Sequence, residues 1–212
     1  MKRGRKKYEN PATARRILAA AESHFAAQGL AGARTEEIAA AAHANKAMLF
    51  YYFKDKQRLH QAVLENLFRQ LKTLFDKLAQ SQAPPRQQLE DFMDGYFDFL
   101  ASHPNYPRLV QREAMESSRE FERIFREYFQ PFQRQLARVI ESGAKSGDFR
   151  RVNAQHAVFS VIGMTNFYFV AAWRFGSAFG GDPLSPRLLA ERKEALMDLI
   201  MHGLLPCQAR PR

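Results

Sequence analysis

The sequence predicts an all-α protein of about nine helices, and three observations support this prediction. Apolar residues recur at three- and four-residue spacing through most of the chain, as they do on one face of an amphipathic helix. No stretch alternates convincingly between polar and apolar residues, as a half-buried strand would. Proline, glycine and asparagine separate the periodic stretches, at positions typical of helix ends. With 212 residues, 46% of them hydrophobic, the chain can bury a sizeable core.

The first helix is expected to begin at Asn10 and Pro11, because asparagine caps helices well and proline suits the first helical position. Gly29 is expected to end it in the left-handed conformation. Residues 1–9, which include the run MKRGRKKY, form a basic arm. This arm is either a solubilising tail or a segment that touches DNA phosphates. The buried face of the helix is expected to consist of Ile17, Leu18, Ala21 and Phe25.

Residues 35–56 have the pattern of a short helix, a tight turn and a second short helix, which is a helix-turn-helix candidate. Thr35 is expected to cap the first of these helices and Asn45 the second. Ile38, Ala39 and Ala42 form the apolar stripe of the first helix. Because any alanine-rich helical hairpin shows a similar pattern, the local sequence alone leaves both interpretations open.

A long connector helix is expected after residue 56, with no flexible linker before it, and Pro84 and Pro85 stop it. Ser118 is expected to cap a later helix, and Pro131 to kink that helix, since proline removes a backbone donor. Gly143 to Gly147 closes it, and Asn153 begins the next one. The helices after the connector are expected at about residues 89–100, 107–116, 118–142, 153–175 and 186–204.

The net charge of +10 is concentrated near the N-terminus. Residues 1–60 hold twelve Lys or Arg against five Asp or Glu, a net of +7. The other 152 residues hold twenty against seventeen, a net of +3. The positive field therefore surrounds the helix-turn-helix candidate, as binding to a polyanion requires.

The number of cysteines and the hydropathy of the chain indicate the cellular compartment in which the protein is expected. The single cysteine, Cys207, excludes a disulfide framework within the chain and favours a reducing cytoplasm. The N-terminus lacks the apolar core of a signal peptide. The most apolar stretch, residues 157–173, is interrupted by polar residues and is shorter than the roughly 20 apolar residues of a spanning helix. We expect a cytoplasmic protein without a membrane partner.

The first helix ending in Phe25 and Gly29, then Thr35, Ile38 and Ala39, and above all the run LFYYFKDK at residues 49–56, form a specific combination. In these residues the first quarter of the chain resembles the DNA-binding domain of the TetR family of transcriptional regulators. The resemblance implies a helix-turn-helix domain at residues 10–55 and a ligand-binding and dimerisation domain at residues 56–212. Beyond the first domain the likeness rests only on the number and length of the helices.

The resemblance also implies that the protein is a homodimer bound to double-stranded operator DNA, with recognition helix 46–52 in the major groove. Lys46, Ala47 and Met48 occupy the positions expected to contact base edges. The residues expected to hold the DNA backbone are Arg34, Thr35, Tyr51, Tyr52, Lys54 and Lys56. Leu49 and Phe53 are expected in the core.

The chain departs from the family's usual pattern at three positions. His43 stands where the turn often has glycine, so it must accept a strained or left-handed backbone. Asn45 stands where the helix often begins with Ser or Thr, a change that keeps the cap. Phe50 stands where tyrosine is common, which removes one phosphate hydrogen bond.

By the same resemblance, the second domain senses a small hydrophobic or aromatic effector and dimerises through the last two helices. Eighteen Phe and seven Tyr suggest an aromatic-lined cavity. An ordinary core aromatic is the alternative explanation for each candidate. The candidate effector residues are Phe92, Tyr96, Arg112, Phe125, Phe129, Asn166, Phe167 and Tyr168.

The sequence favours a ligand-responsive regulator, most simply a repressor released by its effector, over two other functions. A nonspecific DNA-coating protein suits the basic arm but does not require the long aromatic C-terminal region. A small-molecule enzyme lacks support, because the six His and one Cys show no metal-ligand spacing and no glycine-rich phosphate loop occurs. We therefore expect no catalytic residues, no metal and no cofactor.

Overall fold

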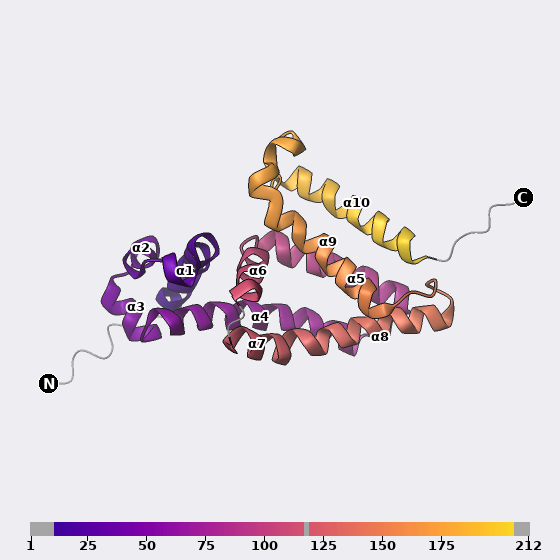
Figure 1. The fold of residues 1–212 in the computed structure, drawn as a ribbon, viewed down its shortest axis with the longest axis horizontal. Helices are drawn as coiled ribbons and strands as arrows, with labels where there is room; N and C mark the ends of the chain where they lie inside the picture. Colours follow the sequence, from indigo (N-terminus) through magenta and orange to yellow (C-terminus); the bar gives the residue numbers. More distant parts are fainter. Residues whose placement is uncertain (1–10, 117–118, 206–212) are drawn as a thin grey trace, which may run out of the picture. The chain divides into compact units, whose positions relative to one another are not determined.

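The computed structural model describes residues 11–116 and 119–205, and the regular elements within these residues are helices, with no strand. The fold-class prediction is therefore confirmed (Figure 1). Within the described residues α7, η2 and α8 follow one another without a break, so the nine expected helices are present, together with the short η3. The elements are α1 (Pro11–Gly32), α2 (Thr35–Ala41), α3 (Lys46–Phe53), α4 (Lys56–Gln80), α5 (Pro85–Ser102), α6 (Tyr106–Glu116), α7 (Arg119–Ile124), η2 (Phe125–Phe129), α8 (Gln130–Ser146), α9 (Ala154–Phe175), η3 (Gly176–Phe179) and α10 (Pro186–Leu204).

The chain forms two compact units. Unit 1 comprises the described parts of residues 1–69 and 108–122, and unit 2 comprises 70–107 and the described part of 123–212. The connector α4 therefore begins in unit 1 and ends in unit 2, and most of α6 belongs to unit 1. The domain boundary placed at residue 55 from the sequence stays a prediction.

The first helix follows the expected pattern, with a difference at its end. Ile17, Ala21 and Phe25 are fully buried on its inner face. Gly29 has a positive φ of 72° but an extended ψ of 175°, so it breaks the helix without adopting the left-handed helical conformation. A further turn then runs to Gly32. The expected cap, Asn10, lies outside the described residues.

The turn between α2 and α3 is formed as the sequence requires. His43 has φ of 50°, which confirms the expected left-handed backbone at the position where glycine is common. The side-chain oxygen of Asn45 accepts a hydrogen bond from the Met48 N–H at 2.8 Å and caps α3. The cap expected at Thr35 is wrong, because Arg34 occupies the N-cap position and makes no side-chain cap bond. The Thr35 hydroxyl instead donates to the Glu36 carboxylate at 3.3 Å.

The local disturbance expected at Pro131 takes the form of a π-helical turn. In η2 the backbone follows the wider π pattern, and the N–H of Gln130 donates to the carbonyl of Phe125. Pro131 follows directly after this π turn, in the first turn of α8. Such insertions are a recognised cause of helix bends. The expected cap Ser118 lies outside the described residues.

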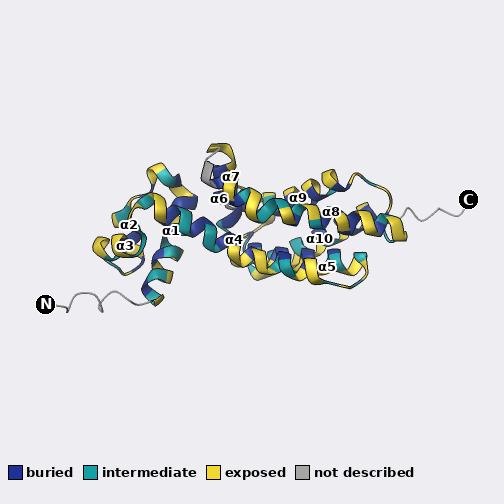
Figure 2. Cartoon of the chain, turned by 90° about the horizontal axis from the view of Figure 1, so that it is seen from below, coloured by how far each residue is buried: buried dark blue, intermediate teal, exposed yellow. Residues whose placement is uncertain are grey.

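The core of unit 2 is formed by α5, α8, α9 and α10, since α5 contacts the other three and α8 also packs against α9. Buried and exposed positions alternate around these helices (Figure 2). Asn153 caps α9 as expected, by accepting from the His156 N–H at 3.1 Å, and Gly147 ends α8 with φ of 89°. The largest fully buried side chains here are Leu71, Leu89, Phe92 and Tyr96.

Residues 11–116 and 119–205 contain neither a membrane-spanning helix nor a metal-binding cluster. None of the helices there is both long enough and apolar enough to cross a membrane. The same residues contain no group of three or more His, Cys, Asp or Glu side chains arranged to hold a metal ion.

Candidate DNA-binding surface and effector site

The N-terminal end of α3 presents three side chains side by side. Lys46 and Ala47 are exposed and Met48 is half-buried. The helix is fixed beneath them by Leu49, which is fully buried, and by the Asn45 cap. The N-terminal residues of a recognition helix are those that reach base edges in the major groove. The fold thus exposes the three residues that the sequence nominated for base contact.

The ammonium of Lys46 is already engaged within the protein. It donates a hydrogen bond to the carboxylate of Glu36 on α2 and lies 5.7 Å from the centroid of the Phe50 ring. The hydrogen bond from Lys46 is the main reason that the pKa of Glu36 falls from 4.5 to about 2. Phe50 is partly exposed, so the aromatic ring that replaces the usual tyrosine contacts a cation.

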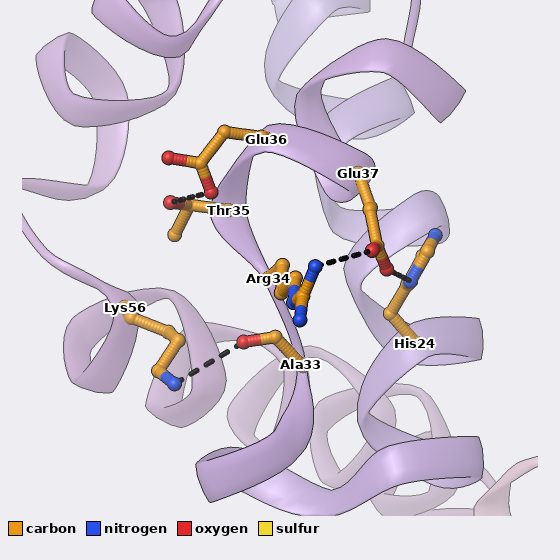
Figure 3. Close-up of polar contacts among 7 residues, drawn as sticks. All are labelled: His24, Ala33, Arg34, Thr35, Glu36, Glu37 and Lys56. Carbon is orange, nitrogen blue, oxygen red and sulfur yellow. Dashed lines mark hydrogen bonds and ion pairs between the residues drawn. The ribbon is translucent and has the colours of Figure 1, made fainter.

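The segment before α2 carries the first of the expected phosphate contacts (Figure 3). Arg34 is extended, with φ of −105° and ψ of 128°, and its side chain is largely exposed. Its guanidinium lies 3.9 Å from the Glu37 carboxylate, which is also 3.9 Å from the His24 ring. These are loose surface pairs, so Arg34 can turn toward an external anion at little cost.

The other expected phosphate contacts lie at the C-terminal end of α3. Tyr51 is 46% exposed, and its ring meets that of Tyr52 edge to face at 5.4 Å. Lys54 follows with φ of 65° and an exposed side chain. Tyrosine hydroxyls and lysine ammoniums are both common donors to DNA phosphates.

Lys56 has a structural contact that the sequence did not suggest. Its ammonium donates to the carbonyl oxygens of Ala31 and Ala33, each at 3.2 Å, and so ties the start of α4 to the end of α1 and to the residue that follows α1. Figure 3 shows the contact with Ala33. A lysine ammonium has three donors, so one is left for another acceptor. Lys56 therefore stabilises the fold in addition to any contact with DNA.

The two expected core residues of α3 differ in burial. Leu49 is in the core, as expected. Phe53 is only half-buried, so the prediction that it lies in the core is wrong. Phe53 is the last residue of α3, where the chain turns away from the helix at Lys54, and part of its ring is left open to solvent.

Arg16 was missed by the sequence analysis. Its Nε donates to the carbonyl oxygen of Ala42 at 3.0 Å, and its Nη2 donates to the Thr13 hydroxyl at 3.2 Å. Ala42 is the C-cap residue of α2, so Arg16 satisfies a carbonyl that would otherwise end the helix unpaired. The basic composition of the N-terminal region could not single out this residue, because the contact spans 26 positions.

Helix α6 packs within unit 1 through a buried polar pair. His60 Nε2 lies 3.1 Å from the Glu113 carboxylate, and both side chains are almost completely buried. The ring of Phe25 meets His60 edge to face at 4.8 Å. On the same helix Arg112 covers Gly29, where an added Cβ would lie 2.9 Å from Nη1. Arg112 therefore packs in unit 1, whereas the other candidate effector residues belong to unit 2.

Five candidate effector residues are linked with Phe132 into one cluster of unit 2. The amide nitrogen of Asn166 donates to the Tyr96 hydroxyl at 2.8 Å. The ring of Phe92 stacks on Tyr96 at 5.4 Å and lies 5.0 Å from Phe132. Phe129 lies 5.7 Å from Phe132 and 4.8 Å from Phe125, which extends the cluster to η2.

The remaining two candidates lie elsewhere. Tyr168 is buried, donates to the carbonyl of Pro183 at 2.7 Å, and is covered by the Arg192 guanidinium. The hydroxyl and the ring of Tyr168 are therefore both engaged in contacts within the protein. Phe167 is 65% exposed and does not join the cluster around Tyr96. One-residue steps along a helix point in different directions, which is why neighbours on α9 have different surroundings.

Comparison with known proteins agrees with this arrangement. The family model described as "Bacterial regulatory proteins, tetR family" matches residues 17–63. The model described as "Tetracyclin repressor-like, C-terminal domain" matches residues 85–200. Together they cover the helix-turn-helix and most of unit 2.

Two curated relatives and one solved structure illustrate the likeness. The HTH-type transcriptional repressor NicS of Pseudomonas putida is 27% identical over 192 residues, which is 89% of this chain and 90% of that protein. The HTH-type transcriptional repressor SCO4008 of Streptomyces coelicolor is 40% identical over 105 residues, about half of each chain. The ketosteroid transcriptional regulator KstR2 of Mycobacterium tuberculosis is 18% identical, with a TM-score of 0.77 over 94% of this chain and 98% of that chain, and shares the fold.

Proposed function

The chain belongs to the TetR family of transcriptional regulators, and from that premise we propose that it is a repressor released from its operator by a small, largely apolar effector. The observation that carries the proposal is the exposed N-terminal end of α3, held by a buried Leu49 and the Asn45 cap. Repression is supported by the names of the two relatives, each a transcriptional repressor.

The DNA-binding side chains form two groups, one that contacts bases and one that contacts phosphates. Lys46, Ala47 and Met48 read base edges, since lysine can donate to guanine and apolar groups can meet the thymine methyl. The phosphate-holding residues fix register without reading sequence, and their contacts make the affinity salt-dependent. These are Arg34, Thr35, Tyr51, Tyr52, Lys54 and Lys56.

Dimerisation through α9 and α10 is supported by apolar side chains that the single chain leaves uncovered. Phe159 is 60% and Phe167 is 65% exposed, and Gly163 lies between them at four-residue spacing on the same face of α9. Gly163 is open on its Cβ side, so a second helix can approach closely there. Leu199 of α10 is also largely exposed. A second copy of the chain would bury this apolar surface, and two recognition helices would then read successive major grooves about 34–36 Å apart.

Effector binding in unit 2 acts on DNA through a population shift. Helix α4 carries residues of both units, so its position can respond to unit 2 and affect unit 1. A ligand that favours one position of α4 lowers DNA affinity by the ratio of its affinities for the two states, typically about 1–3 kcal/mol of coupling.

Selection of bound duplexes from a random DNA pool tests this function. A specific regulator enriches a two-fold symmetric site and prefers it over random duplex by roughly 10³ or more. A nonspecific DNA-coating protein enriches no site. Repeating the selection with candidate apolar effectors identifies those that release the DNA, and an effector that binds without changing operator affinity would remove the proposed mechanism.

An enzyme has no support from the relatives. The matched family models and the curated relatives are all transcriptional regulators.

A further inference from the structure

Two neighbouring polar groups inside the aromatic cluster of unit 2 have unused hydrogen-bonding capacity. Asn166 donates through its Nδ2 to the Tyr96 hydroxyl at 2.8 Å and to the Ile162 carbonyl at 3.0 Å. Its Oδ1 atom is buried and has no hydrogen-bond partner within the described part of the chain. The Tyr96 hydroxyl accepts from Asn166, and no acceptor for its own hydrogen occurs among the described residues. The Tyr96 hydroxyl can therefore donate one more hydrogen bond, and the neighbouring Asn166 Oδ1 can accept one.

The orientation of the Asn166 amide follows from its neighbours. The Ile162 carbonyl can only accept, so the amide atom that faces it must be the nitrogen. The two amide hydrogens are then used by Ile162 and Tyr96, and the free atom is the oxygen. Turning the amide over would place two oxygens against each other at Ile162. The unpaired acceptor is thus a consequence of the fold.

The Tyr96 hydroxyl stays protonated and can donate. Its side chain is almost completely buried, and burial raises the pKa of Tyr96 far above its usual value, although the hydrogen bond from Asn166 opposes this. A neutral donor beside a neutral acceptor favours a neutral ligand, since a charged group placed here would lose its hydration without an opposite charge.

The surroundings favour a flat ligand. The Phe92 ring stacks on Tyr96 with an interplanar angle of 17°, and Phe132 follows Phe92 at 5.0 Å. Phe75 stacks on Phe132 at 3.8 Å with an angle of 10°. Phe92 also lines a cavity of about 300 Å³ between α4 and α5, and the lining of this cavity includes neither Tyr96 nor Asn166. Stacked aromatic faces offer contact area to planar rings.

We propose that the effector is a planar, neutral cyclic amide whose carbonyl accepts from the Tyr96 hydroxyl and whose adjacent N–H donates to Asn166 Oδ1. This inference rests on the proposed ligand-responsive function and names the chemistry that the site takes. A secondary cyclic amide carries its C=O and N–H on neighbouring ring atoms, which matches the two free groups. A hydrocarbon of the same shape would leave both buried groups unpaired and would bind more weakly.

The test uses one matched pair of probes on the full-length protein. 2-Quinolone presents the C=O and N–H edge, and N-methyl-2-quinolone has the same rings with the N–H blocked. We expect 2-quinolone to bind in titration calorimetry and the N-methyl compound to bind roughly tenfold more weakly or worse. Tyr96→Phe and Asn166→Leu should each reduce this preference to less than about threefold.

A control variant separates the hydrogen-bond pair from general disturbance of α9. Thr165 is buried beside Asn166, and its hydroxyl donates to the Val161 carbonyl. Thr165→Val should therefore keep the preference for 2-quinolone. All variants are first tested for binding to the DNA selected from the random pool, which shows that they are folded and functional.

The outcomes separate the two proposals. If no DNA site is selected, the proposed regulatory function fails regardless of the probes. If the selected DNA is bound but 2-quinolone binds no better than its N-methyl analogue, the assignment of the effector class is overturned. It is also overturned if the preference survives in Tyr96→Phe and Asn166→Leu, or if a crystal structure grown with 2-quinolone shows only ordered water on both atoms.

Discussion

The ammonium of Lys46, at the start of α3, donates a hydrogen bond to the carboxylate of Glu36, in the first turn of α2. In the protein without DNA, Lys46, which is expected to contact a base, is therefore paired with Glu36 of the same helix-turn-helix. Contact with guanine requires Lys46 to leave Glu36, or to share its donors between the carboxylate and the base. The pair thus sets how readily Lys46 becomes available to DNA, and the first two predictions follow from it.

The titration of Glu36 reports this pair directly. Because Lys46 stabilises the ionised form, Glu36 should titrate at about pH 2 in the free protein. The depressed pKa means that any stabilisation by the pair is complete above pH 4.5 and is lost as the pH falls through about 2. Carboxyl-carbon NMR should show the pKa rising toward 4.5 in Lys46→Ala and on addition of operator DNA. Lys54→Ala, which does not contact Glu36, should leave it low; a wild-type value near 4.5 would contradict the pairing.

Glu36→Gln should weaken discrimination among DNA sequences. Without the carboxylate, Lys46 is freed and one negative charge is removed from the surface that faces phosphate. Affinity for random duplex should rise several-fold and more than affinity for the selected site, since only the nonspecific complex lacks a base partner for Lys46. Competition binding at fixed salt measures the ratio. Glu37→Gln is the matched control, because Glu37 pairs loosely with Arg34 and His24; an equal loss of discrimination there would contradict the role of Glu36.

Three lysine variants distinguish base recognition, phosphate binding and stabilisation of the fold. Lys46→Ala should change sequence preference, while Lys54→Ala should weaken binding to all duplexes alike and reduce the salt slope by about one. Lys56→Ala should also weaken all binding, and should in addition lower the melting temperature, because its ammonium holds the Ala31 and Ala33 carbonyls. Melting curves and salt titrations of the same samples separate these effects. If Lys46→Ala and Lys54→Ala affected every sequence equally, the division into reading and holding residues would be wrong.

Glu113→Ala should destabilise unit 1 although Glu113 lies far along the chain from the helix-turn-helix. The substitution leaves the buried His60 ring without its carboxylate partner, which costs about 1–3 kcal/mol of unfolding free energy. Urea unfolding gives the magnitude, and hydrogen exchange should show lost protection in α1 and the first half of α4. Glu116→Ala, an exposed position on the same helix, should change the stability by less than about 0.5 kcal/mol. Unchanged exchange in α1 would argue against this packing.

Phe159→Glu and Phe167→Glu should each shift the protein from dimer to monomer. The exposed phenyl rings on α9 would meet a second chain, and a buried unpaired carboxylate opposes association. Sedimentation velocity at micromolar concentration measures the change, and operator affinity should fall with it. Met115→Glu is the control, since Met115 on α6 is 81% exposed and lies outside the proposed interface. A dimer that persists in both phenylalanine variants would place the interface elsewhere.

Local chemistry explains which parts of the fold the sequence predicted well. Asn45 caps α3, His43 takes a positive φ, and Gly147 ends α8, because each depends on the residue and its nearest neighbours. The prediction of a Thr35 cap was wrong because Arg34 occupies the N-cap position, and the Thr35 hydroxyl donates to Glu36. Gly29 has the expected positive φ, but the helix resumes after it for one more turn.

The sequence by itself determined the helical class, the helix-turn-helix and the residues at the exposed end of α3, since periodicity and capping act within a few residues. Only the tertiary structure decided which distant side chains meet. It paired Lys46 with Glu36, Arg16 with the Ala42 carbonyl, and His60 with Glu113. It also placed Arg112 in unit 1 and joined Tyr96 to Asn166 in unit 2. These contacts depend on how helices far apart in sequence pack, and the spacing of residues along one helix does not contain that information.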